Sequence, residues 1–203
     1  MRGFTALSWA AASLAAVGVE GNERLTAATG AVLIVLLAAL GVTILDIGPL
    51  VWWHVLLGML LIPPVLLKLG STGWRFYRYY TGKPEYVRRG PPVLGLRLLA
   101  PIVVAATIGV FATGVALLVV GPGSHGFVVL LHKASFVIWL GATAIHVLAH
   151  LGKVPRAASR VPGAHRFLLA AAIVAGAIVA VATIQYAHPW VDWMASHRHF
   201  GDG

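Results

Sequence analysis

The chain has 203 residues, of which 59% are hydrophobic and 10% charged, with a formal net charge of +9 and no cysteine. This composition predicts an integral membrane protein, and the lack of cysteine excludes disulfides, thiolate metal sites, covalently attached c-type haem and iron–sulfur clusters. The positive charge could indicate nucleic-acid binding, but the basic residues lie in the loops of a hydrophobic chain. There they report membrane orientation, so we predict no nucleic-acid function.

Five apolar runs long enough to cross a membrane alternate with short polar connections. They lie at about 25–45, 50–70, 98–120, 127–151 and 167–186. The predicted fold class is therefore an all-α integral membrane protein in a lipid bilayer. Its predicted parts are a four-helix transmembrane bundle over residues 22–151, a fifth transmembrane helix within residues 152–187 and a tail over residues 188–203.

The N-terminal segment, residues 1–21, contains a shorter apolar stretch than the five runs. Its apolar stretch from Phe4 to Val19 is short for a span. We therefore expect an interfacial or short extra helix there.

Basic residues divide unevenly between the two ends of the spans. The connections 71–97 and 152–166 are rich in Lys and Arg, whereas the turn 121–126 has neither and the tail has only Arg198. Because positively charged loops stay inside the cell, we predict a multi-pass protein of the cell membrane with both basic connections cytoplasmic and the tail external. The aromatic and basic segment after Gly73 should continue the second span as a helical turn at the headgroups.

Three histidines, His132, His146 and His150, fall on one face of the run 127–151, because steps of fourteen and eighteen residues return close to the same helical position. His54 begins the second run, at the same predicted depth as His132. Helices running in the same direction can place these two imidazoles opposite each other, as axial ligation of a b-type haem iron requires. Alternatively, both are interfacial residues bonded to carbonyls or water.

Two lysines accompany these histidines. Lys133 follows His132 and could neutralise a haem propionate, or simply extend to the headgroups. Lys68 lies fourteen residues after His54, at the level of His146, and could contact a propionate or a quinone carbonyl, or extend to the cytoplasmic headgroups. His146 and His150 also have the spacing of a metal pair, but two histidines without a nearby carboxylate or thiol are a weak metal site.

The placement of His54, His132 and His146 resembles that of the bacterial cytochrome b561-type membrane cytochromes b, which include the b-type subunits of formate dehydrogenases and nickel-iron hydrogenases. The resemblance covers about residues 22–151. It implies an outer haem b held by His54 and His132, a second inner haem involving His146, and electron exchange between an external redox partner protein and the quinone pool.

The chain departs from this family at the inner level, because the family's histidine on the first helix has no counterpart in residues 22–30. Three interpretations of this level remain. His146 pairs with an unusual partner such as His165, the inner site holds no haem, or His146 and His150 serve a quinone or a proton path.

The leading functional hypothesis is an electron-transfer subunit of an oxidoreductase that holds one or two haems. A second hypothesis is a cofactor-free scaffold or assembly protein derived from a cytochrome b fold. A third, a small transporter, has only the Pro63-Pro64 helix break in its favour, since the spans carry no acidic residues and no evident internal repeat.

Overall fold

The computed structural model describes residues 18–88, 90, 94–123, 126–150 and 163–198. Five helices in these ranges are long and apolar enough to cross a membrane. The protein is therefore an all-α, multi-pass membrane protein, which confirms the fold class predicted from the sequence. The long helices are α2 (Val19–Leu45), α3 (Ile47–Tyr80), α5 (Leu94–Val120), α6 (Gly126–His150) and α8 (Gly163–Thr183).

Three short helices lie among the described residues: α4 (Pro84–Val87), η2 (Ile184–Ala187) and α9 (His188–Arg198). The predicted N-terminal helix lies outside the described residues except for its last few positions. Most of the connection 152–166 and the side chain of His150 also lie outside them. The basic and aromatic segment after Gly73 continues α3 as a helix to Tyr80, as the sequence predicts.

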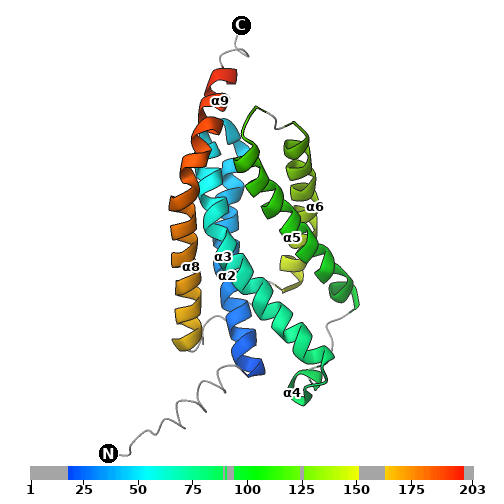
Figure 1. The fold of residues 1–203 in the computed structure, drawn as a ribbon. Coiled ribbons are helices and arrows are strands. Elements are labelled where there is room, and N and C mark those ends of the chain that lie inside the picture. The colour runs from blue at the N-terminus through cyan, green and yellow to red at the C-terminus, as the bar shows by residue number, and fades with distance from the viewer. Residues whose placement is uncertain (1–17, 89, 91–93, 124–125, 151–162, 199–203) are drawn as a thin grey trace, which may run out of the picture.

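The long helices form two groups that meet along α3 (Figure 1). In one group, α2 and α8 both pack along α3. In the other, α5 and α6 form an antiparallel hairpin whose main contacts are internal. We call the two ends of the molecule the α4 end and the α9 end, after the short helices found there (Figure 1).

The backbones of α3 and α8 approach closely at one point, next to the proline pair. Pro63 and Pro64 lie inside α3, and Pro64 has no N–H to donate to the carbonyl of Leu60, four residues earlier. Gly176 of α8 lies against this carbonyl, and a Cβ atom at Gly176 would overlap the Leu60 oxygen. Only glycine permits this contact, in which a Cα–H group faces an otherwise free carbonyl.

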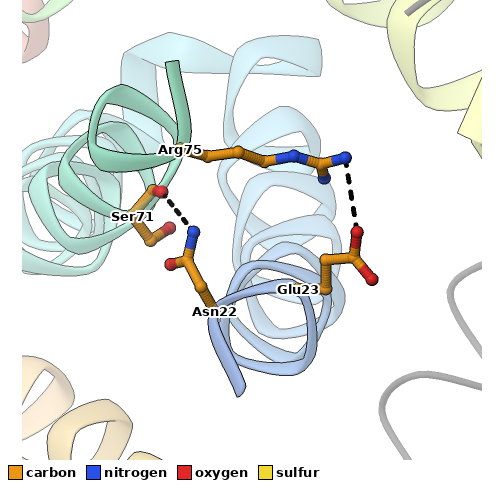
Figure 2. Close-up of polar contacts among 4 residues, drawn as sticks. All are labelled: Asn22, Glu23, Ser71 and Arg75. Atoms are coloured by element: carbon orange, nitrogen blue, oxygen red, sulfur yellow. Dashed lines mark hydrogen bonds and ion pairs between the residues drawn. The ribbon is translucent and has the colours of Figure 1, made fainter. Parts of the chain in front are cut away.

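Polar side chains join α2 to α3 at the α4 end (Figure 2). The side-chain amide of Asn22 donates to the backbone oxygen of Ser71 over 3.0 Å, and Arg75 lies 3.3 Å from the carboxylate of Glu23. Asn22 and Ser71 are both buried. Because polar groups inside a membrane protein need partners, these contacts fix how α2 is aligned along α3.

Most of the tail is helical. Residues 188–198 form the helix α9, which continues the direction of α8 through η2 (Figure 1). Trp190 is only 6% exposed, and its indole N–H donates to the backbone oxygen of Leu117 over 3.1 Å. The indole therefore joins α9 to the last turn of α5, while His188 and His197 are exposed.

Candidate functional site

An apolar cavity of about 440 Å³ lies between α3 and the α5–α6 hairpin, toward the α9 end. Its volume falls within the range of small-molecule and cofactor sites. The lining is aliphatic and aromatic, and the charged or titratable side chains in it are His54, His132 and Lys133. A site of this kind suits a mainly hydrophobic ligand that a few polar groups orient.

The structure brings His54 of α3 and His132 of α6 together in this cavity. Their ring centroids are 6.4 Å apart, and the ring planes are nearly perpendicular, at 86°. The equal depth inferred from the sequence therefore corresponds to a direct juxtaposition across the boundary between the two helix groups.

A threonine on the neighbouring helix fixes the tautomer of His54. Thr43 of α2 lies with its Oγ1 atom 2.8 Å from Nδ1 of His54. Oγ1 of Thr43 also lies within hydrogen-bonding distance of the backbone oxygen of Leu40, which can only accept, so both contacts are hydrogen bonds only if Nδ1 of His54 donates. The hydrogen-bond network thus assigns the proton of His54 to Nδ1 and leaves the lone pair on Nε2.

The same arrangement occurs at His132. Oγ1 of Thr113, on α5, lies 3.0 Å from Nδ1 of His132 and donates its own proton to the backbone oxygen of Gly109 over 2.7 Å. Because a backbone oxygen can only accept, both contacts of Thr113 are hydrogen bonds only if His132 donates from Nδ1, which leaves Nε2 as its basic nitrogen. Gly114 gives the ring room against α5, since a Cβ atom there would lie 3.2 Å from Cε1 of His132.

The distance between the two rings suits a single metal ion between them. If two imidazoles bound one ion from opposite sides, each with a nitrogen–metal distance of about 2.0 Å, their ring centroids would be roughly 6.3 Å apart. The observed separation is 6.4 Å. Metal-binding histidines usually donate their second ring N–H to a protein acceptor, and Thr43 and Thr113 lie where such acceptors would be needed. Two ligands are too few for a structural zinc ion, but haem iron brings four nitrogens of its own.

Tryptophans line both ends of the cavity along the bundle. Trp139 of α6 lines it on the side away from α9, and its indole N–H donates to Oγ1 of Thr107 over 3.1 Å. At the other end, α9 contributes Trp190, Trp193 and Met194 to the lining. Gly58 of α3 also lines the cavity, with no atom within 4 Å of where its Cβ would stand, so the space beside His54 stays open.

The other predicted site residues lie in different surroundings. Lys133 lines the cavity beside His132, whereas Lys68 is in the polar contact region of α2 and α3, where Nζ donates to the backbone oxygen of Thr26 over 2.6 Å. Lys68 also lies against Gly30, as a Cβ atom there would be 3.1 Å from Nζ. Neither His146 nor His165, the proposed inner pair, contributes to the lining of the cavity.

Sequence reasoning missed Thr43 and Thr113. Threonine is common in apolar helices. Because each contact runs between two helices, the separations of 11 and 19 residues from the histidines reflect the chain between the two contact points and not a helical period. The only signal available was a hydroxyl near the α9 end of each helix that precedes a histidine helix.

Comparisons of the chain with protein-family models, curated proteins and solved structures found no match. The fit between the site and a cofactor therefore depends on the geometry of the site itself.

Proposed function

We propose that the protein is a membrane-embedded electron-transfer protein that holds one b-type haem between His54 and His132. The observation that carries this proposal is the pair of imidazoles, 6.4 Å apart at the wall of an apolar cavity, each with Nδ1 at hydrogen-bonding distance from a threonine hydroxyl. When bound, the haem supplies reversible one-electron exchange at its iron. The chain's own groups would hold, orient and shield it.

Each part of the site would have a defined task. The hydroxyls of Thr43 and Thr113 hold the two rings in the tautomer that presents Nε2, and they raise the basicity of that atom by accepting from Nδ1. The aliphatic lining excludes water, which favours the less charged, reduced state of the iron. The ammonium group of Lys133 offers a counter-charge to a propionate beside His132.

The proposed orientation in the membrane decides where each redox partner would meet the protein. The α4 end carries Arg75, Arg78, Lys83, Arg88 and Arg97 and would face the cytoplasm, so that α9 and the cavity lie near the external surface of the cell membrane. An external redox partner protein would then exchange electrons at the α9 end, and the quinone pool of the bilayer would be the second partner. A second haem at His146 remains a prediction of the family resemblance.

The test is a dithionite-reduced minus air-oxidised absorption spectrum of the detergent-purified protein, expressed with ample haem supply. The expected result is a sharp, low-spin b-type signal at one haem per chain. His54→Ala and His132→Ala should each abolish the signal, while His188→Ala, an exposed control outside the cavity, should keep it. A colourless wild-type protein would overturn the proposal in favour of the cofactor-free scaffold. Two haems per chain would support a second, inner haem at His146.

A further inference from the structure

We propose that the α4 end carries a binding site for the phosphate group of an anionic phospholipid, centred on the guanidinium group of Arg78. This site lies at the opposite end of the molecule from the histidine cavity and does not depend on the proposed haem.

The length of α3 places Arg78 at the headgroup level. With 34 residues, α3 is about 51 Å long at 1.5 Å per residue, against a hydrocarbon core about 30 Å thick. Its uncharged run lies before Lys68, so the last turns emerge among the headgroups. There α3 exposes Trp74, Phe76 and Tyr77, side chains of the kind that settle at the interface between lipid and water.

Two aromatic rings hold the Arg78 side chain. Its Cζ atom lies 5.4 Å from the ring centroid of Trp74 and 5.7 Å from that of Tyr86 in α4. Tyr86 is only 4% exposed, so α4 is folded firmly back onto α3. The turn that permits this includes Gly82, whose φ of +73° suits glycine. The guanidinium group is thereby held in place before any ligand arrives, which reduces the entropy cost of binding.

The charge of Arg78 is not neutralised by the described part of the chain. The ion pairs found there join Arg24 to Glu20 and Arg75 to Glu23, and the buried Nε atom of Arg78 has no hydrogen-bond acceptor among the described residues. A partly buried cation at a membrane surface favours a counter-ion. Phosphate oxygens match the planar donor fork of arginine and accept from two nitrogens at once.

Neighbouring residues reinforce the attraction for an anion. Lys83 and Arg88 flank α4 and are exposed, and the backbone N–H of Lys83 bonds to the backbone oxygen of Arg78 over 3.2 Å. From the start of α5, Arg97 donates to the hydroxyl of Tyr80 over 2.6 Å. A lipid bilayer is the partner that this end of a membrane protein always meets, and its anionic headgroups match both the charge and the depth.

The experiment measures lipid binding to the full-length protein by native mass spectrometry, with phosphatidylglycerol titrated against phosphatidylcholine. Wild type is expected to retain one phosphatidylglycerol molecule at least tenfold more tightly than phosphatidylcholine. Arg78→Gln should remove this preference, and Tyr86→Ala should weaken it. The matched control Arg24→Gln removes an equal charge at the same end of the molecule, from an arginine already paired with Glu20, and should keep the preference.

Three outcomes would overturn the proposal. An equal loss in Arg78→Gln and Arg24→Gln would indicate diffuse attraction to the whole basic surface. Displacement of the bound lipid by millimolar inorganic phosphate would indicate a site for the free anion. If Arg78→Gln does not fold, Arg78→Lys decides the question, because it keeps the charge but not the planar fork, and an undiminished preference in that variant would contradict a bidentate site.

Discussion

The two helical hairpins, α2–α3 and α5–α6, have similar chemistry and different support. In each, a threonine on the first helix accepts a hydrogen bond from a histidine on the second, so each hairpin orients its own imidazole. The first hairpin is supported by α8, which packs along α3, whereas the second meets the rest of the protein around an apolar cavity. The difference indicates that packing holds one side of the site, while a cofactor would tie the other side to it.

The largest expected effect comes from filling the cavity without touching either histidine. Gly58→Phe would place a ring in the open space beside His54, where no atom lies within 4 Å of the glycine's missing Cβ. We expect complete loss of haem with normal folding and membrane insertion, measured by haem content and size-exclusion profile. Gly41→Phe, at an exposed and equally open position on α2, should bind haem normally. Haem retained in Gly58→Phe would place the cofactor elsewhere.

A second substitution tests the close packing of α8 against α3. Gly176→Leu would force a side chain into the carbonyl of Leu60, where the backbone of α3 cannot easily move. Overpacking of this kind costs about 1–3 kcal/mol, so the apoprotein should unfold at lower temperature or denaturant concentration. Gly73→Leu, at an exposed position in α3 with open space around it, should be neutral or slightly stabilising. Equal stability of the two variants would show that α3 and α8 are not in close backbone contact.

Loss of either threonine hydroxyl should weaken haem binding and shift the reduction potential without abolishing binding. Thr43→Val and Thr113→Val keep the shape of each side chain but remove the acceptor for Nδ1 of His54 or His132. We expect haem affinity to fall about 10- to 100-fold in each, with a raised reduction potential measured by redox titration, because the Nε2 atom that would bind the iron becomes less basic. Thr29→Val is the control, since Thr29 is fully buried and donates only within its own helix. If all three variants bind alike, the hydroxyls do not orient the ligands.

The smallest effect is expected at the α9 end. Trp190→Phe removes the indole donor to the backbone oxygen of Leu117 but keeps an aromatic ring in the cavity wall. A neutral hydrogen bond contributes about 0.5–1.5 kcal/mol, so α9 should open several-fold more often. Stopped-flow reduction by dithionite should accelerate by a similar factor, whereas Trp53→Phe, at a half-exposed position, should leave the rate unchanged. An unaltered rate in Trp190→Phe would mean that α9 does not limit access.

The sequence predicts those features that depend on one helix at a time. Span number, the aromatic and basic extension of α3 and the equal depth of His54 and His132 all follow from hydropathy and helical geometry. Features that depend on lateral packing could not be read in this way. Hydropathy treats every apolar helix as equivalent, so it does not reveal that α8 packs against α3 through Gly176.

The environments of Lys68 and Trp190 were unpredictable for the same reason. Their residue types indicate contact with headgroups, yet each donates to a backbone oxygen on a neighbouring helix, Thr26 for the lysine and Leu117 for the tryptophan. Such partners carry no mark in the sequence, because every residue has a backbone carbonyl.

The position of α9 late in the chain has a consequence for biogenesis. Both imidazoles and both threonine acceptors have been synthesised once the ribosome passes His132, while Trp190, in the helix that covers the α9 end of the cavity, is synthesised later. At typical rates of translation, the interval between these two residues lasts roughly 3 to 12 seconds. During that interval the nascent cavity is open at one end, so we expect cofactor loading to occur before the C-terminal helix is in place. A mature protein that has lost its cofactor would then reload slowly, at a rate set by the opening of α9.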